Sequence, residues 1–427
     1  MLEIIIANTA EAFANLLDRA GAASDRALHE RDLAGRALFW GGREKIIVTP
    51  NPIAADLIAQ AAELLNAERL EVWVPVAASL RLCADILDDI VLLERLRHET
   101  AGAPCHVCPY AVTPEFCELS DTLGWGDYRA ALRAAVEVDS KAGFRRLFEN
   151  SALLLPKGRI CHDAAQTASG ALALLSEGYD VVVKVHNGES GWGLKFIDAQ
   201  DFQSAELEDV GTAIATLFDS DSVWSEGPYI VEERVRLDRS RDGYSPSGEA
   251  TVEERGVRFD YACDQVLSAG GAFAGISIDG AMQLSPVAEE VRRQTLIVGE
   301  LLRSLSYRGT FDVDFVIDAG GRTVAVESNV RLTGGTHVVG AARSIFGEHW
   351  REKSFVSDDA ISYGPPAITP CEILQRLSPV LLRRGGERGV ILSFVSASRP
   401  ILGAIGVGSS REEAMAQLSW MQDLLAA

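Results

Sequence analysis

The sequence has no long apolar run and comparatively few basic residues. No uninterrupted apolar stretch approaches the ~20 residues that a membrane-spanning helix needs. There are 40 Lys and Arg against 61 Asp and Glu, which gives a formal net charge of −21. Nucleic acids and anionic membranes are themselves negatively charged and do not favour an acidic surface. The composition therefore argues against nucleic acid and against a membrane as the main partner.

Cysteine is scarce and odd in number, with seven residues at 83, 105, 108, 117, 161, 263 and 371. Such scatter does not indicate a disulfide framework, and the first residues, Met1 to Asn8, lack the basic region of a secretory signal. Cys105 and Cys108 form a single CxxC without a second ligand pair, which favours buried free thiols over a metal or redox site. We expect a reduced, cytoplasmic protein.

The first third of the chain alternates between strand-like and helix-like segments. A chain of 427 residues has room for two to four domains. Strands are expected at 4–6, 45–49, 70–74 and 106–112, and helices at 53–67, 80–97 and 114–123. This order predicts a parallel sheet with helices on its faces, a Rossmann-like layer. A GxGxxG string is missing, so no dinucleotide is assigned.

The segment from Gly309 to His337 reads as two strands joined by a turn at 319–322. In that register Asp314 lies opposite Glu327, with Cβ atoms about 4.5–5.5 Å apart. Two carboxylates so close, with no lysine beside them in the sequence, repel each other. Asn329 offers a third oxygen, and such hard ligands suit Mg²⁺ better than Zn²⁺. The alternative is an ordinary hairpin whose acids face water.

Upstream lie two lysines and a glycine-rich segment. Lys141 belongs to a short helix at 139–150, and Lys184 to an apolar strand at 178–185. A segment whose amides can approach an anion follows, containing Gly188, Ser190, Gly191 and Gly193. The alternative is a simple turn beside a strand-edge lysine. No Walker A string occurs, and a further strand at 228–237 contains Glu232 and Glu233.

The order of these parts resembles the ATP-grasp superfamily over about residues 139–345. The Asp314…Glu327-x-Asn329 spacing is similar to that of D-alanine–D-alanine ligases. The run Asn-Val-Arg-Leu-Thr-Gly-Gly-Thr-His (329–337) and the helix start at 406–414 resemble the peptide ligase family of pheganomycin biosynthesis. The resemblance implies an α/β (α+β) ATP-grasp fold between a Rossmann-like pre-ATP-grasp domain and a small α/β C-terminal domain. The implied divisions are a pre-ATP-grasp domain at 1–138, a small lid subdomain at 139–230, a large subdomain with the Mg-ATP site at 231–364, and a C-terminal domain at 365–427.

The resemblance also implies a role for each candidate residue. The residues implied for ATP are Lys141 and Lys184 at the phosphates, Gly188, Ser190, Gly191 and Gly193 in the covering loop, and Glu232, Glu233 and Val235 at the adenine. Asp314, Glu327 and Asn329 would hold Mg²⁺, whereas Asp312 matches no metal position. The residues implied for chemistry and substrate are Arg331 at the transferring phosphoryl group, Gly334, Gly335 and Thr336 at the acceptor pocket, and His337 as a base. For His337 the alternative is a pocket or core histidine.

The activity implied is an ATP-dependent carboxylate–amine ligase that forms an amide through an acyl phosphate. The partners would be a small carboxylate and an amine, amino acids or a small peptide, in specialised metabolism, and a homodimer is left open. Three alternatives stand beside it: transfer to a carrier-protein thiol, a phosphotransferase, and a non-catalytic ATP-binding regulator. No motif identifies the two substrates.

Overall fold

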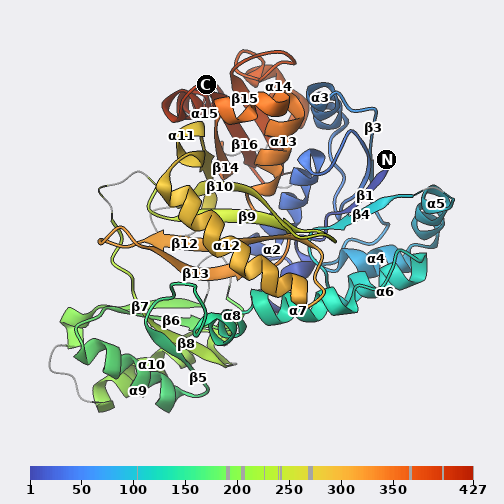
Figure 1. Ribbon diagram of the computed structural model, residues 1–427. Helices are drawn as coiled ribbons and strands as arrows, with labels where there is room; N and C mark the ends of the chain where they lie inside the picture. Colours follow the sequence, from blue (N-terminus) through green and yellow to red (C-terminus); the bar gives the residue numbers. More distant parts are fainter. Residues whose placement is uncertain are drawn as a thin grey trace. The chain divides into compact units, whose positions relative to one another are not determined.

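The computed structural model describes residues 1–102, 104–188, 193–202, 207–225, 227–238, 240, 243–267, 273–364, 368–396 and 399–426 (Figure 1). The chain forms two compact units. The first comprises Met1–Leu132, Ala274–Leu284 and Arg331–Ala427, and the second comprises Arg133–Phe273 and Ser285–Val330. Helix α7 (Arg129–Asp139) runs through one boundary. Among the described residues, no helix is both long and apolar enough to cross a membrane. The four divisions drawn from the sequence stay a prediction.

The first unit contains the predicted parallel sheet, in the order β3-β2-β1-β4. Its strands are β1 (Glu3–Ile6), β2 (Glu44–Val48), β3 (Arg69–Trp73) and β4 (His106–Pro109). The helices of this part are α1 (Ala14–Ala20), α2 (Asp25–Asp32), the 3₁₀ segment η2 (Leu33–Phe39), α3 (Ala55–Leu65), α4 (Leu82–Asp88), α5 (Ile90–Thr100) and α6 (Pro114–Leu123). Isoleucine and valine side chains of β1 and β2 are completely buried in its core.

One helix expected at 80–97 is in fact two, α4 and α5. Asp89 lies between them, and its carboxylate accepts the backbone N–H of Leu92 at 3.0 Å and that of Val76 at 3.0 Å. An aspartate that accepts amides at the start of a helix is an N-cap, and it begins a new helix rather than continuing the old one. The apolar spacing alone did not reveal this break.

The C-terminal part of the first unit is an antiparallel arrangement of strands in the order β11-β14-β16-β15. These strands are β11 (Phe273–Ile278), β14 (Ser354–Ser362), β15 (Gly389–Val395) and β16 (Ile401–Gly408). The helices are α11 (Gly280–Gln283), α13 (Thr336–Phe346), α14 (Pro370–Leu377) and α15 (Arg411–Ala426). Strand β14 was not predicted, because its serines and aspartates hide the apolar alternation.

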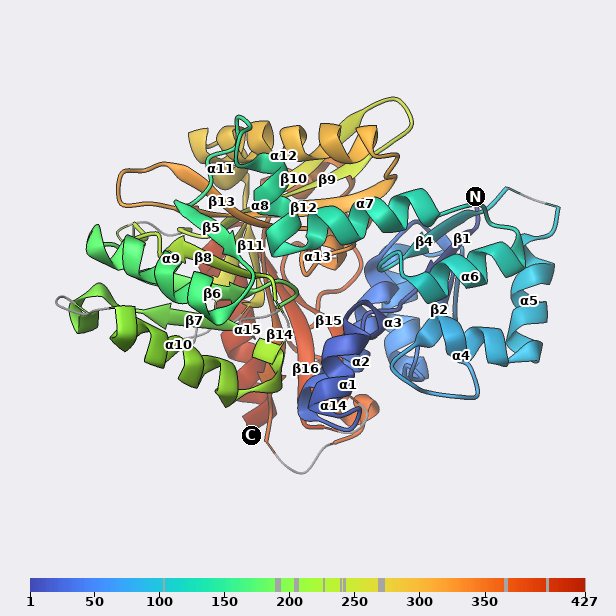
Figure 2. The same ribbon diagram turned by 90° about the horizontal axis from the view of Figure 1, so that it is seen from below.

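The smaller sheet of the second unit is antiparallel, in the order β5-β8-β6-β7. Its strands are β5 (Gly158–Cys161), β6 (Val181–Val185), β7 (Leu194–Ile197) and β8 (Tyr229–Glu233). Helices α9 (Ala164–Ser176) and α10 (Leu207–Ser220) lie side by side against it (Figure 2). All residues of β6 are buried, Lys184 included, so the alternative of a strand-edge lysine in water is wrong.

The second unit also contains the predicted hairpin, which pairs onward in the order β13-β12-β9-β10. The elements are β9 (Pro246–Val252), β10 (Val257–Leu267), β12 (Gly309–Ile317), β13 (Thr323–Asn329) and α12 (Pro286–Ser304). Helix α12 packs on β9 (Figure 1), where a Cβ on Gly248 would lie 2.6 Å from both Thr295 Oγ1 and Val291 Cγ1. This close packing needs glycine on the strand. Helix α8 (Lys141–Phe148) completes the unit.

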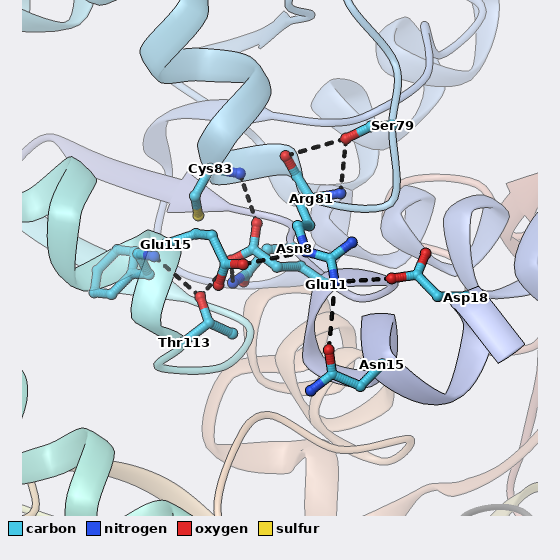
Figure 3. A network of polar contacts seen from close by, with 10 residues as sticks. Asn8, Glu11, Asn15, Asp18, Ser79, Arg81, Cys83, Thr113 and Glu115 are labelled. Atoms are coloured by element: carbon cyan, nitrogen blue, oxygen red, sulfur yellow. Dashed lines mark hydrogen bonds and ion pairs between the residues drawn. The ribbon is translucent and has the colours of Figure 1, made fainter. Parts of the chain in front are cut away.

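A buried polar network lies just beyond the carboxyl ends of the parallel strands β1 and β4 (Figure 3). The Glu11 carboxylate accepts the Asn8 side-chain amide at 3.0 Å, the Cys83 backbone N–H at 2.6 Å and the Thr113 hydroxyl. Burial raises the pKa of Glu11, and these hydrogen bonds oppose the rise. Because three donors already surround the carboxylate, the network ties the loops after the strands together. The seven cysteines all lie among the described residues and are free. Cys105 and Cys108, which were expected to be buried thiols, are only partly buried.

Lys45 on β2 is completely buried and donates to the carbonyls of Leu38 at 2.8 Å and Trp40 at 2.5 Å. Burial lowers the pKa of Lys45 from 10.5 to about 8. Between pH 8 and pH 10.5, Lys45 is therefore protonated in the unfolded chain but largely neutral in the folded protein. Because the folded protein no longer buries a charge, its stability rises as pH rises through this interval.

We expect wild type to gain stability relative to Lys45→Met between pH 8 and pH 10.5, the interval between the lowered and the ordinary pKa. The gain cannot exceed about 1.4 kcal/mol per pH unit for one group. Urea unfolding of both proteins at several pH values measures the difference. A difference that stays flat or falls across this window would show that the lysine is not buried as described.

Candidate active site

The hairpin β12–β13 brings the predicted metal ligands together. Asp314 pairs with Glu327 across the two strands, as the sequence predicted, and Asp312 pairs with Asn329. The Asn329 side-chain amide donates to Asp312 Oδ1 at 2.8 Å and to Asp314 Oδ2 at 3.1 Å. Asp312, which the sequence analysis set aside, therefore belongs to the same cluster as the three candidate ligands.

The electrostatics of this cluster favour a bound cation. Burial raises the pKa of Asp314 well above its usual value, and the neighbouring carboxylates of Asp312 and Glu327 raise it further. Hydrogen bonds from Ser247 and Asn329 oppose this rise. Like charges held together at low dielectric are unfavourable, and a hard divalent cation would relieve that repulsion. The donor set of carboxylate and amide oxygens fits Mg²⁺.

A lysine from a distant part of the sequence lies beside the acid pair, although none is near Asp314 or Glu327 in the sequence. Lys141 Nζ lies 2.7 Å from Glu327 Oε2 and donates to the Gly188 carbonyl at 2.7 Å. Helix α8 fixes the position of this lysine, because Ser140 caps its first turn by accepting the Gly143 N–H at 3.1 Å. One cation thus connects the hairpin of the candidate metal ligands to the start of the glycine-rich segment.

Lys184 takes part in a buried ion cluster with two partners. Its Nζ lies 2.6 Å from Glu232 Oε2, and Arg145 NH2 lies 2.9 Å from Glu232 Oε1. Burial alone would raise the pKa of Glu232, but Lys184 and Arg145 outweigh that effect and lower it. The Glu232 side chain is only 5% exposed and is engaged by both cations. The carboxylate thus pairs with Lys184 and Arg145, and its role at the adenine stays a prediction.

The other candidates for the nucleotide are only partly described. Glu233 Oε1 accepts the Lys157 N–H at 3.0 Å, and Val235 is half-buried beyond the end of β8. Gly193 has a φ of +78°, and a Cβ there would lie 2.2 Å from a methyl group of Val185. Glycine is therefore required at that position. Ser190 and Gly191 lie outside the described residues, so their role stays a prediction.

The residues expected at the acceptor side belong to the first unit. The Arg331 guanidinium lies 4.9 Å from the centre of the Phe13 ring. The Gly335 N–H donates to Thr333 Oγ1 at 3.3 Å, and the Thr333 N–H donates to Thr336 Oγ1 at 2.8 Å, so this turn is internally braced. Gly334 lies within that turn, just before α13. Contacts of Arg331, Gly334, Gly335 and Thr336 with a substrate stay a prediction.

His337, the proposed base, is completely buried. Burial and the nearby Arg36 charge lower its pKa well below the usual value, and a hydrogen bond with the Gly334 backbone only partly opposes this. A base must reach the proton that it removes. This burial favours the alternative of a core histidine, and the role of His337 as a base stays a prediction.

Sequence reasoning missed several members of these clusters. Arg145 could have been found, since it lies one helical turn after Lys141 on the predicted helix. Gln265, which donates to Asp314 Oδ1 from β10, left no local signal because the contact joins distant segments. Within the described part of the chain, no group of three or more His, Cys, Asp and Glu side chains is arranged to hold a metal ion. The candidate site therefore relies on the Asn329 amide beside two carboxylates.

Comparison with known proteins identifies the fold. Residues 34–125 match the family model described as the Pre ATP-grasp domain. A similar solved structure is the biotin carboxylase domain of 2-oxoglutarate carboxylase from Hydrogenobacter thermophilus. It is 12% identical, with a TM-score of 0.56 and coverage of 98% of this chain and 89% of that one. The chain has the ATP-grasp fold with a pre-ATP-grasp domain, which confirms the fold expected from the sequence.

Two curated relatives carry the similarity further. Butirosin acyl-carrier protein–L-glutamate ligase from Niallia circulans is 26% identical over 266 residues, which is 60% of this chain and 56% of the relative. L-propargylglycine–L-glutamate ligase from Streptantibioticus cattleyicolor is 26% identical over 304 residues, 65% of this chain and 59% of the relative. The resemblance to ATP-grasp ligases is thereby confirmed. The matched region spans less than two thirds of either relative's length.

Proposed function

We propose that this protein is an ATP-dependent carboxylate–amine ligase that forms an amide or peptide bond on an amino acid or small peptide. The observation that carries the proposal is the cluster on β12–β13, in which Asp314, Glu327 and Asn329 lie together with Lys141 on Glu327. Hard oxygen ligands beside a lysine suit a metal–nucleotide complex. The ligase names of both curated relatives support the proposal.

ATP and Mg²⁺ are the ligands proposed for this cluster. Asp314, Glu327 and Asn329 would hold the metal, and Lys141 and Lys184 would face the phosphates. Bound Mg²⁺ neutralises charge on a transferring phosphoryl group and orients it. The similar carboxylase domain is itself described as a complex with the magnesium salt of ADP, which supports the same choice of ligand.

The proposed reaction has two steps. A substrate carboxylate oxygen attacks the γ-phosphorus of ATP, the bond to ADP breaks, and an acyl phosphate forms. The amine then attacks the acyl carbon, the C–O bond to phosphate breaks, and the nitrogen loses a proton as the amide forms. Lys141 and Lys184 stabilise negative charge in the first step, and Arg331 is assigned to the phosphoryl oxygens. Acyl phosphates hydrolyse, so the site must exclude water while the intermediate is present.

L-Glutamate is the first substrate to test, because the names of both curated relatives contain it. Those names also support a place in specialised metabolism. We further propose a cytoplasmic protein, in keeping with its free cysteines, and a homodimer, in keeping with the carboxylase domain being described as a dimer.

A second candidate is a ligase that transfers an amino acid to a carrier-protein thiol. The name of the Niallia circulans relative, which includes an acyl-carrier protein, favours it. In this reaction the product stays attached to the carrier. Intact-protein mass spectrometry of a carrier protein with a free thiol, incubated with this protein, ATP and L-glutamate, separates the two candidates. A gain of one glutamyl residue on the carrier supports the second, and a free dipeptide supports the first.

The test of the main proposal is an ADP-release screen with Mg²⁺ over pairs of amino acids, starting with L-glutamate in every pair. We expect ADP and inorganic phosphate in equal amounts, dependent on both substrates. Omission of the amine and omission of Mg²⁺ are the controls. A phosphorylated product without inorganic phosphate would identify a phosphotransferase instead. Tight ATP binding without turnover on any pair or carrier would favour a regulator.

A further inference from the structure

Three ionisable side chains of the first unit meet in its interior. Arg36 on η2, His337 on α13 and Asp359 on β14 are 5%, 0% and 2% exposed. Arg36 NH2 lies 2.7 Å from Asp359 Oδ2, and His337 Nε2 lies 3.6 Å from Asp359 Oδ1. The aspartate therefore pairs with the arginine and lies beside the histidine, just beyond hydrogen-bond distance of its Nε2, so three elements that are far apart in the sequence meet here.

Burial of these charged groups costs free energy, which only a well-formed Arg36–Asp359 pair can offset. Burial raises the pKa of Asp359 to about 6, although the Arg36 charge opposes the rise. An ion pair taken out of water stabilises a fold only when its geometry is good, because its attraction must outweigh the cost of removing both charges from water. The surrounding packing is equally restrictive, because a Cβ on Gly340 of α13 would lie 2.1 Å from the Phe39 carbonyl. The start of α13 is thus fixed against η2.

The segment that leads into α13 is held at its other end as well. The Leu332 N–H donates to the Tyr110 carbonyl at 2.9 Å, and the Arg331 guanidinium stacks on Phe13. Tyr110 follows β4 and Phe13 precedes α1, so both belong to the N-terminal part of the unit. Residues 331–336 are therefore held at both ends. Contacts with Tyr110 and Phe13 hold the first end, and His337, beside Asp359 and Arg36, holds the second.

We propose that Asp359 and Arg36 are positioning residues, which act through His337 to hold residues 331–336 in the conformation that binds the amine substrate. The inference rests on the proposed function, in which this segment contacts the substrates. It assigns His337 to the support of the segment and gives the pre-ATP-grasp part of the chain a role in choosing the acceptor.

Asp359→Asn tests the inference, with Asp32→Asn as the matched control. Asp32 forms a second, partly buried pair in the same unit, 2.7 Å from Arg399 Nη2, and is the last residue of α2. Both changes remove one charge from an Arg–Asp pair without changing shape, so both should lower stability. Only Asp359→Asn should speed hydrogen exchange of the amides of residues 332–339. Only it should raise the KM for the amine by about tenfold or more, since misplacement by ~1 Å can cost more than that. The KM for ATP should stay constant.

His337→Gln keeps the Arg36–Asp359 pair and serves if Asp359→Asn does not fold. Positioning predicts a raised KM for the amine with kcat little changed, whereas loss of a base would lower kcat at an unchanged KM. Unchanged exchange at 332–339 in both variants, or an equal change in the Asp32→Asn control, would overturn the inference. The exchange measurement needs no turnover. It therefore judges the inference even if wild type forms no amide, a result that would count against the proposed function alone.

Discussion

Asp314→Asn should abolish amine-dependent ADP release and leave the folded protein at least as stable as wild type. The change removes a carboxylate that lies beside two others, Asp312 and Glu327, so it relieves like-charge repulsion in the metal-free protein. The same change replaces a charged metal ligand with a neutral amide, which binds Mg²⁺ less strongly. A metal ion contributes several kcal/mol of charge stabilisation, so turnover should fall by at least about two orders of magnitude.

The measurement pairs an ADP-release assay with thermal unfolding, both with and without Mg²⁺ and ATP. Wild type should be stabilised by these ligands, because anything that binds only the folded state raises its stability, and Asp314→Asn should lose that gain. Glu327→Ala should also abolish turnover, but it leaves Lys141 without its carboxylate partner. Asp314→Asn is therefore the cleaner test.

Asp318→Asn is the matched control on the same hairpin. The Asp318 carboxylate accepts the N–H groups of Gly320 and Arg322 at 2.9 and 2.8 Å and pairs with the Arg322 side chain at 2.6 Å. Asp318→Asn should cost about 1–3 kcal/mol of stability through those contacts and leave turnover intact. Asp314→Asn should thus lose turnover and keep stability, whereas Asp318→Asn should lose stability and keep turnover. If Asp314→Asn kept more than one tenth of wild-type turnover, the metal assignment would be wrong.

The hairpin could be predicted from the sequence because its determinants are local. Alternation of apolar and acidic residues fixes which side chains share a face, and a short turn fixes the register. Next to the turn, Ile317 pairs with Thr323, and that register alone would set Asp314 opposite Val326. A β-bulge between Asp314 and Phe315, which the sequence did not predict, shifts the pairing and brings Asp314 opposite Glu327. The parallel sheet of the first unit was equally accessible, since strand–helix alternation leaves few other topologies.

Long-range ionic contacts were not accessible in this way. No residue near Glu327 in the sequence predicts its contact with Lys141. Likewise, no residue near Glu232 predicts that two cations pair with its carboxylate. Burial is similarly non-local. His337 sits in a run of small and polar residues that suggests a loop at the surface, yet packing against η2 and β14 excludes it from water. Periodicity reports which face a side chain is on, but it does not report what covers that face.

Glu232→Gln should cost the second unit about 3–5 kcal/mol of stability, the usual result of removing one partner from a buried ion cluster. The change leaves two cations, Arg145 and Lys184, whose side chains are only 6% and 10% exposed, close to each other without their carboxylate. The adjacent Glu233→Gln is the matched control. Glu233 is half-buried and accepts one backbone N–H, so its loss should matter far less.

The pH dependence separates a charge effect from a packing effect in Glu232→Gln. The two cations hold the pKa of Glu232 below its ordinary value of 4.5, so the unfolded chain binds this proton more readily than the folded one. The advantage of wild type over the variant is therefore complete above about pH 4.5, and it is lost as pH falls through the lowered pKa. Urea unfolding of wild type, Glu232→Gln and Glu233→Gln from neutral to acid pH should show the first two converge while the control runs parallel to wild type. A loss below about 1 kcal/mol at neutral pH would mean that water reaches the cluster. Lys184 would then not be held in place by Glu232, and its role at the phosphates would need another support.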